Sequence, residues 1–355
     1  MIEPHSGIAA CVQPVPIPLP LPEMNVARYE IRLRSEEESR IPAFPGSTLR
    51  GAFGHALKAT VCVTHHRDCD NCLVSARCVY PLVFTTPSSP EFESSAGKQA
   101  PHPYILDAPV HRQRSESDQS RSGSKWERHR YLQSGDELVF GMMLLGSAIQ
   151  HLPYLVLAIH RMAAHGLGVA RSPFALMEVI QISAAGERVS IYDGATQKFA
   201  AQLVRAESLQ DFVAARMSEL GIFSELCLQF STPTRLIIQG DLQSEANFEL
   251  ILRSLLRRLR MLGEVHGAGA VSWDYDRLLN LANEVKTQES QLRWWDWERY
   301  SNRQQTKMRL GGFVGEIRFE GEALQELLPF VCAGELLRLG KGTSFGLGKY
   351  EITKA

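Results

Sequence analysis

Four cysteines that follow one another closely in the sequence could together bind a metal ion: Cys62, Cys69, Cys72 and Cys78. Cys69 and Cys72 have the two-residue spacing of a zinc knuckle, and two more thiolates nearby complete a tetrahedral set. Such a zinc ion would be structural, because four protein ligands leave no open position, and it would fold an insertion that lacks a core. An iron–sulfur cluster and free thiols are the alternatives. The remaining cysteines lie in apolar contexts and are expected in the core: Cys11, Cys227 and Cys332.

A glycine-rich, basic segment near the C-terminus is a second candidate site, residues 340–349 (GKGTSFGLGK). Glycines allow backbone amides to approach a phosphate closely, and Lys341 and Lys349 make the segment locally positive. It is not a nucleotide P-loop, because it follows a predicted helix and precedes a predicted strand. A tight helix-to-strand turn is the alternative. The lysines favour RNA, with Thr343 and Ser344 as further contacts.

Aromatic and basic residues alternate in a third segment, residues 294–304 (WWDWERYSNRQ). Aromatic and guanidinium planes can stack on unpaired bases, and arginine also binds phosphate. We expect RNA contacts from Arg299, Ser301 and Arg303, whereas Trp294 and Trp295 favour core or interdomain packing. A further basic row, on the helix predicted at 248–262, is either a solvated face or part of an RNA groove; its members are Arg253, Arg257 and Arg260.

Length and charge limit what these sites can belong to. At 355 residues the chain exceeds one ordinary domain, which predicts two domains with separate cores. A hydrophobic content of 44% and a charged content of 22% are typical of globular proteins. The formal net charge of -1 gives no overall attraction to a polyanion, so any nucleic-acid site must be a local basic patch.

The N-terminal residues favour neither export nor membrane insertion. Residues 11–22 are apolar but interrupted by prolines, which is typical of an extended strap rather than a signal helix. The sequence has no apolar run of about 18 residues or more. The seven cysteines are therefore expected as thiols or metal ligands rather than disulfides, and the expected compartment is the cytoplasm.

Hydrophobic patterning predicts the elements that must position these sites. In the first half we expect strands at 26–34, 80–84, 137–145 and 174–180, a helix at about 48–59 capped by Ser47, and a helix at 153–165. Residues 111–125 have the composition of a mobile segment. An Asp-Gly hairpin is expected at 188–199.

The second half repeats this order. Strand material at 225–238 precedes a leucine-striped helix at 248–262, followed by a strand at 313–319, a helix at 323–337 and a strand at 349–353. The order predicts an α+β protein of two tandem ferredoxin-like (βαββαβ) domains, residues 1–220 and 221–355. The first domain would carry the zinc insertion at about 61–79 and a flexible loop at about 86–130.

Several of these segments together resemble the Cas-six endoribonucleases of CRISPR systems, members of the repeat-associated RNA-binding (RAMP) superfamily. The segments are IPAFPGSTLRGAFGHALK, the cysteine insertion ending in CVYPLVF, RYSNRQ with the following LGGFVGEI, and GKGTSFGLGKYEI. The resemblance covers residues from about 24 to 353. The glycine-rich loop is shared across the superfamily, and its combination with the cysteine insertion and RYSNRQ is more specific.

The resemblance implies two ferredoxin-like domains and cleavage of the repeat in precursor CRISPR RNA without a catalytic metal. The 2′-hydroxyl beside the scissile phosphate attacks it and leaves a 2′,3′-cyclic phosphate and a 5′-hydroxyl. Such enzymes often keep their product. The implied partners are therefore CRISPR repeat RNA and other Cas subunits of an effector complex, with no membrane contact.

Catalytic residues vary within the family, commonly a histidine near the first helix with tyrosine or lysine helpers. The resemblance implies His55 as the leading candidate, with Lys58 nearby to stabilise charge, and His266 as the second candidate. Tyr300 is a further proton or phosphate contact, and Arg50, on the helix of His55, is expected to bind RNA. Two histidines of the insertion could be metal ligands, surface residues or catalysts: His65 and His66.

Two other functions stay open on these residues. The chain could be a non-catalytic subunit that holds a repeat-derived RNA within a larger complex. It could also be an assembly module whose zinc insertion docks neighbouring subunits, with the glycine-rich segment serving only as a turn. Steep loss of RNA affinity with added salt would count against the assembly module, because phosphate contacts release counterions.

Overall fold

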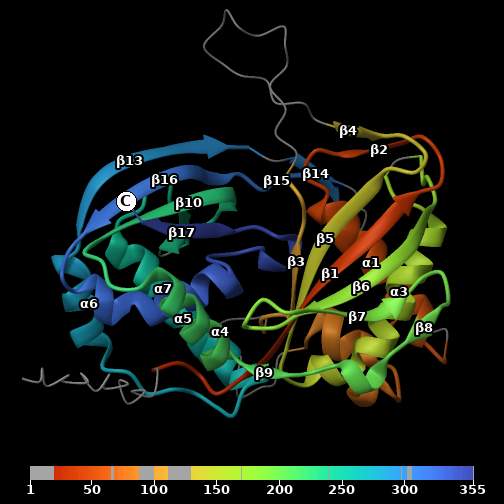
Figure 1. Ribbon diagram of the computed structural model, residues 1–355, viewed down its shortest axis with the longest axis horizontal. Coiled ribbons are helices and arrows are strands. Elements are labelled where there is room, and N and C mark those ends of the chain that lie inside the picture. The colour runs from red at the N-terminus through yellow and green to blue at the C-terminus, as the bar shows by residue number, and fades with distance from the viewer. Residues whose placement is uncertain are drawn as a thin grey trace, which may run out of the picture.

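The computed structural model describes residues 20–64, 68–87, 100–110, 129–168, 170–238, 240–296, 298–301 and 306–354. They form an α+β protein with two antiparallel sheets that lie side by side, each packed against helices (Figure 1). Among these residues, none of the helices has the length and apolar character needed to cross a membrane.

The first sheet has the strand order β3-β5-β1-β6-β7-β8, with β9 pairing beside β1. Its strands are β1 (Asn25–Ser35), β3 (Tyr104–Asp107), β5 (Glu137–Leu145), β6 (Phe174–Ile182), β7 (Arg188–Asp193), β8 (Lys198–Phe199) and β9 (Glu207–Ser208). Buried and more exposed residues alternate along β1, as expected for a strand with one face on a core. Helices α1 (Gly46–Val61) and α3 (Leu152–His165) pack together behind the sheet (Figure 1).

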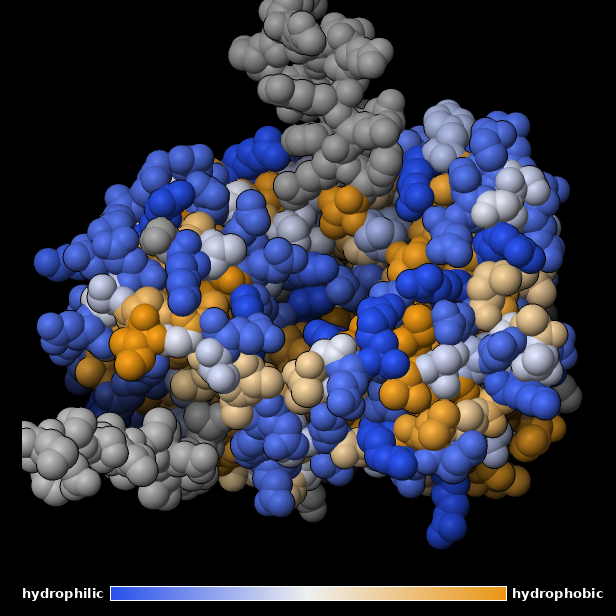
Figure 2. All heavy atoms as spheres, in the orientation of Figure 1, coloured by the Kyte–Doolittle hydropathy of each residue, from blue (hydrophilic) through white to orange (hydrophobic). Residues whose placement is uncertain are grey.

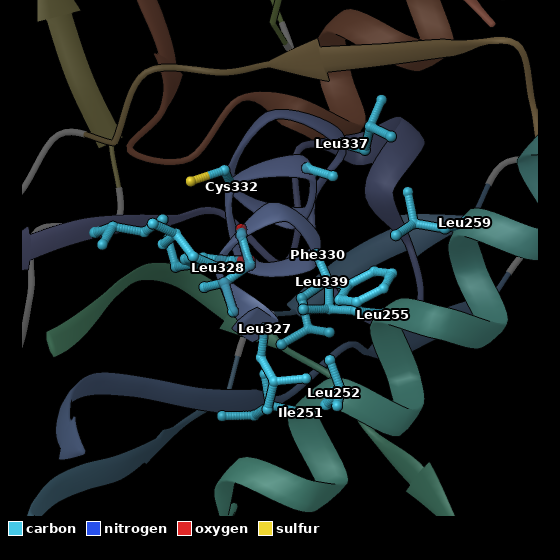
Figure 3. Packing of buried hydrophobic residues seen from close by; sticks show 14 of the residues in the cluster. Ile251, Leu252, Leu255, Leu259, Leu327, Leu328, Phe330, Cys332, Leu337 and Leu339 are labelled. Carbon is cyan, nitrogen blue, oxygen red and sulfur yellow. The ribbon is translucent and has the colours of Figure 1, made fainter. Parts of the chain in front are cut away.

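The second sheet has the order β13-β16-β10-β17. Its strands are β10 (Glu225–Thr234), β13 (Lys286–Trp295), β16 (Gly312–Glu320) and β17 (Tyr350–Lys354). Three helices accompany it: α5 (Phe248–His266), α6 (Tyr275–Glu284) and α7 (Leu324–Leu337). In Figure 3 the leucines Leu252, Leu255 and Leu259 of α5 face Phe330 and Leu327 of α7.

Short elements connect these layers. Helix α4 (Leu209–Leu220) links the sheets and begins with a capping box between Ser208 and Asp211. Three small ribbons pair β2 (Ser39–Pro42) with β4 (His129–Leu132), β11 (Ile237–Ile238) with β12 (Asp241–Leu242), and β14 (Glu298–Ser301) with β15 (Thr306–Arg309). Short helical segments are 3₁₀-helical at Ser75–Arg77, Gly146–His151, Ala201–Leu203 and Thr343–Phe345, and π-helical at Pro81–Thr85.

Each sheet has its own apolar core, and the two halves exchange residues between the cores. Leu347, which follows the second sheet's helices, is fully buried in the cluster of the first sheet. In the opposite direction, Leu21, Met24 and Val26 belong to the cluster of the second sheet. Neither core is therefore complete without residues from the other half of the chain.

Most predicted elements are present within one or two residues, but the predicted strand at 80–84 is wrong. Residues Pro81–Thr85 form a π-helical turn instead, in which Tyr80 stacks on Phe84 at 5.3 Å between ring centroids. A short apolar run does not distinguish a strand from a buried helical turn. The strand that takes its place in the sheet is β3, within the stretch predicted as a flexible loop at 86–130; residues 88–99 and 111–128 of that stretch lie outside the described part.

Two further differences concern helix ends and an edge strand. Ser47 does not cap α1, which begins at Gly46 with Pro45 at the N-cap and no side-chain cap. Strand β13 was not predicted, because its residues are polar and exposed on both faces at the edge of the sheet. The Asp-Gly hairpin is confirmed as β7 and β8.

Candidate nucleic-acid interface

The glycine-rich loop, residues 340–348, packs against the first half of the chain. Its 3₁₀ turn, Thr343–Phe345, is bounded by Gly342 and Gly346, whose φ angles of 81° and 85° are in the left-handed region that favours glycine. The Phe345 carbonyl lies so close to Gly46, the first residue of α1, that a Cβ at Gly46 would overlap it. The loop is therefore fixed against the N-terminal end of α1.

Arg50 of α1 holds this loop. Its Nε donates to the Ser344 hydroxyl at 3.2 Å, so the charged group bridges the two halves of the chain. The guanidinium lies over both the Phe84 and the Phe345 ring, 4.5 Å from each ring centroid. Stacked cation–π contacts of this kind add to the hydrogen bond and restrict the arginine rotamer.

Arg50 also contacts His102, a residue that no sequence pattern had indicated. Arg50 Nη2 is 3.2 Å from His102 Nε2, and Thr86 Oγ1 is 3.1 Å from His102 Nδ1. Because arginine can only donate, Nε2 accepts and Nδ1 donates to the threonine. Burial, followed by the charge of Arg50, lowers the His102 pKa to about 3. His102 is thus a neutral structural group with both ring nitrogens engaged.

A charged cluster ties β3 to the C-terminal strand. Asp107 accepts from Arg338 Nη2 at 3.1 Å and from Lys349 Nζ at 3.1 Å. Burial raises the Asp107 pKa, but Arg338 and Lys349 outweigh burial and hold the pKa below its ordinary value. Lys349, predicted to bind RNA, is therefore paired with a carboxylate of the first half, and Arg338 is buried beside it.

His266, the second catalytic candidate, ends α5 and faces the same junction. Its Nε2 donates to the Pro101 carbonyl at 2.7 Å. Burial is the main cause that lowers its pKa, the Pro101 contact opposes it, and the charge of Arg258 adds to the lowering. Arg258 itself donates to the Leu337 carbonyl at 2.9 Å. His266 therefore has one nitrogen committed to the backbone, and its imidazole favours the neutral form.

His55 and Lys58 lie on α1, three residues apart but in different surroundings. His55 is exposed, on the same helix whose first turn meets the glycine-rich loop. The Lys58 ammonium lies 5.5 Å from the Tyr80 ring centroid and beside the cysteine insertion. The arrangement leaves His55 accessible to a ligand and directs Lys58 toward the insertion.

The other predicted RNA contacts occupy different places. Lys341 is exposed, whereas Thr343 and Ser344 are buried in the loop's turn. The basic row on α5 is exposed, and two of its members form ion pairs within the helix, Arg253 with Glu249 and Arg260 with Glu264, while Arg257 is exposed between them.

The aromatic segment is only partly described. Trp294 is 41% exposed and donates to Asp296, whereas Trp295 is half-buried and packs against Phe44 of the first half at 6.3 Å. Arg299, Tyr300 and Ser301 belong to β14, whose side chains are not described, and Arg303 lies outside the described residues. The structure therefore brings Arg50, Ser344 and Lys349 together at the junction, and it does not place the RYSNRQ side chains.

The cysteine insertion lies at the other end of α1. Cys62, Cys69, Cys72 and Cys78 are half-buried and line one small pocket, but among the described residues no three histidine, cysteine or acidic side chains are close enough to hold a metal ion. The Val74 amide, followed by the Thr64 hydroxyl, lowers the Cys72 pKa. His65 and His66 lie outside the described residues.

The surface over the junction of the two sheets is hollowed. Figure 2 shows hydrophilic side chains gathered in this hollow, between the regions that Figure 1 assigns to β17 and to β3 and β5. Charged residues that line the strands there include Asp107 and Lys349 at the junction, and Arg28 and Glu30 on β1. A polar groove of this kind can hold an extended, charged ligand.

Comparisons with known proteins assign both halves of the chain. Residues 21–204 match the AF_1859_N family model, described as an N-terminal domain, and residues 228–350 match the model described as CRISPR-associated endoribonuclease Cas6. No curated protein sequence matches the chain significantly.

Solved structures agree in fold. A chain of a partial Cas6-RT-Cas1–Cas2 complex aligns with a TM-score of 0.58 and 12% identity over 95% of this chain, which spans 47% of that one. A Cas6 product complex aligns with a TM-score of 0.51 and 15% identity, covering 93% of this chain and 99% of that one. The family match therefore assigns residues 228–350, which hold most of the second sheet and its glycine-rich loop, to the CRISPR-associated endoribonuclease Cas6 family, and the solved structures show the same fold over nearly the whole chain.

Proposed function

We propose that this protein is an endoribonuclease that cuts precursor CRISPR RNA within the repeat without a catalytic metal. The observation that carries the proposal is the docking of the glycine-rich loop, part of the Cas6 match, onto α1 through Arg50. This contact fixes the loop that carries the exposed Lys341 against α1, and the exposed His55 lies farther along the same helix.

The proposed architecture is two tandem ferredoxin-like domains, residues 1–220 and 221–355. The four main strands have the order β3-β5-β1-β6 in the first sheet and β13-β16-β10-β17 in the second. In both sheets, the strand that comes first in the sequence lies between the third and the fourth, and the second lies at the edge beside the third. A helix follows the first and the third of these strands in both halves. This repeated order supports the proposal, because a βαββαβ unit closes into that arrangement.

The proposed reaction is an internal transfer of the phosphate. The 2′-oxygen forms a bond to phosphorus, the bond to the 5′-oxygen breaks, and the products are a 2′,3′-cyclic phosphate and a 5′-hydroxyl. A base removes the 2′ proton, an acid protonates the leaving oxygen, and cations stabilise the phosphorane. His55 suits either proton transfer because an imidazole can both accept and donate a proton, and the exposed Lys341 suits the role of the cation.

Cleavage of the cognate repeat RNA in EDTA tests the proposal directly. We expect the wild-type protein to cut in EDTA and His55→Ala to lose about 100-fold or more in rate, with affinity changed less than about twofold. His165→Ala is the matched control, because His165 is also exposed on a helix, at the end of α3. Intact RNA with wild-type protein that demonstrably binds it would refute the nuclease.

Salt dependence separates the two lysines of the glycine-rich segment. Lys341 is exposed, so Lys341→Ala should reduce the slope of log affinity against log salt by about one. Lys349 is paired with Asp107, so Lys349→Ala should mainly lower stability and leave that slope nearly unchanged. The opposite result would mean that Lys349 leaves Asp107 to bind phosphate.

A second candidate function is a non-catalytic subunit that holds a CRISPR RNA for an effector complex. The observation in its favour is that both nitrogens of His102 and one nitrogen of His266 are already committed to protein partners. Stoichiometric RNA binding without cleavage, unchanged in His55→Ala, would favour it. Retention of the cut RNA by an active enzyme would instead support a nuclease that stays with its product alongside other Cas subunits.

A further inference from the structure

The described residues of the cysteine insertion, 62–64 and 68–78, form no apolar core that could hold the segment folded. Its large apolar side chains point outward: Val63 is 76% exposed, Leu73 101% and Val74 42%. The backbone is organised only by single turns, in which Cys72 donates to Cys69, Ser75 to Cys72 and Cys78 to Ser75. Ordering a segment costs conformational entropy, and with so little apolar burial another interaction must offset that cost.

These turns bring the four thiols to one place. Three consecutive turns, each closed by a backbone hydrogen bond between residues three apart, connect residues 69–78. Cys69, Cys72 and Cys78 line one pocket, and Cys62, at the end of α1, lines it too. The Thr64 hydroxyl connects two of them, at 3.9 Å from Cys62 Sγ and 3.6 Å from Cys72 Sγ. The four cysteines of the insertion thus line one pocket, although they are up to 16 residues apart in the sequence.

We propose that Cys62, Cys69, Cys72 and Cys78 bind one structural Zn²⁺ ion. In the described structure no three potential ligands are at metal-binding separation, so the side chains must rotate into the pocket as the ion binds. Four thiols then release four protons and form four Zn–S bonds of about 2.3 Å in a tetrahedron.

The surroundings suit the charge of such a site. A Zn²⁺ ion with four thiolates has a net charge of -2 by formal counting, and Lys58 lines the same pocket with its ammonium near Tyr80. A nearby cation favours deprotonated thiols. Lys58 therefore acts at the metal site rather than at the RNA, which distinguishes it from His55 on the same helix.

Metal analysis of the purified full chain tests the proposal. We expect about one equivalent of zinc per chain, and Cys72→Ser should reduce bound zinc to a small fraction of one equivalent. Cys227→Ala is the matched control, because Cys227 is a buried cysteine of β10 outside the insertion, and it should retain full zinc content. Because Cys72→Ser could misfold the insertion, a second measurement uses the wild-type protein with its zinc exchanged for Co²⁺.

Cobalt reports the ligand set directly. Tetrahedral thiolate ligation should give an intense sulfur-to-cobalt absorption band that Zn²⁺ abolishes by competition, and four thiols should become reactive when a chelator removes the ion. Less than about a tenth of an equivalent of zinc, iron with acid-labile sulfide, or disulfides in the insertion would each overturn the proposal. RNA cleavage in EDTA is measured separately, so failure of the zinc site and failure of the proposed nuclease are distinguishable.

Discussion

The glycine-rich loop and the cysteine insertion are both short connections of unusual composition, but they are held in opposite ways. Residues 340–348 are largely buried and contact the first half through Arg50, Phe345 and Leu347. In the cysteine insertion, the described residues 62–64 and 68–78 include exposed Val63, Leu73 and Val74, and their backbone hydrogen bonds form local turns. One segment is fixed by packing against a distant part of the chain, whereas the described residues of the other have only local turns, and the proposed zinc ion would supply its cross-link. Substitutions in the two segments should therefore differ greatly in effect.

The largest effect is expected at Gly348. Its φ of 76° is in the left-handed region, and a Cβ there would overlap the Leu339 carbonyl. Gly348→Ala should therefore lower the free energy of unfolding by about 3 kcal/mol or more in urea titrations. Gly51→Ala is the control, because its Cβ on α1 meets nothing within 4 Å, and it should be neutral or stabilising by up to about 1 kcal/mol. Equal effects of the two would show that the loop tolerates a side chain.

Arg50 should come next. Arg50→Ala removes two hydrogen-bond contacts and two stacked rings, which should lower the free energy of unfolding by about 2–3 kcal/mol. Arg50→Lys keeps the charge but not the planar group, and it should recover less than half of that loss. Full recovery by lysine would mean that charge alone holds the loop.

A smaller, pH-dependent effect is expected at His102. Its pKa of about 3 in the folded protein lies below the ordinary value of 6.5, so the unfolded chain binds a proton that the folded chain does not. Stability should then fall as pH falls from 6.5 toward 3. Between pH 7 and 5 the wild type should lose about 1–2 kcal/mol more than His102→Gln in urea titrations. Parallel curves for the two proteins would contradict the buried, neutral histidine.

The smallest effect is expected at an exposed apolar side chain of the cysteine insertion. Leu73 is fully exposed, so Leu73→Asp should change the free energy of unfolding by less than about 0.5 kcal/mol, measured in the same titrations. A loss above about 1 kcal/mol would show that Leu73 packs against something in the folded protein and would remove the contrast with the glycine-rich loop.

The repeated fold was predictable because its main elements have strong local signals. The leucine stripe predicts α5, and apolar and polar alternation predicts β1. The capping box at Ser208 and Asp211 was a signal that could have located α4. Strand β3 could not be located in the same way, because it is four residues long and follows a stretch of Ser and Pro. Its position in the sheet depends on pairing with β5, which sequence spacing does not encode.

The candidate site was predictable in part. Composition identified the glycine-rich loop and the cysteine cluster, since glycine and cysteine have few other uses at such spacing. The residues that hold the loop were not identifiable, because His102 and Asp107 are far in sequence from their partners Arg50 and Arg338, which they meet only through the fold. A single histidine or aspartate carries no pattern, and tertiary contacts alone give it a role.

The exchange of residues between the two cores has a consequence for synthesis on the ribosome. Strand β9, the last strand of the first sheet, ends at Ser208, whereas Leu347 fills part of the core behind that sheet. At about 5–20 residues per second, the nascent first half waits on the order of ten seconds with that part of its interior uncovered. During this interval the growing chain is exposed to chaperones and to self-association, and the first core is completed only when the glycine-rich loop has been synthesised and packs against it.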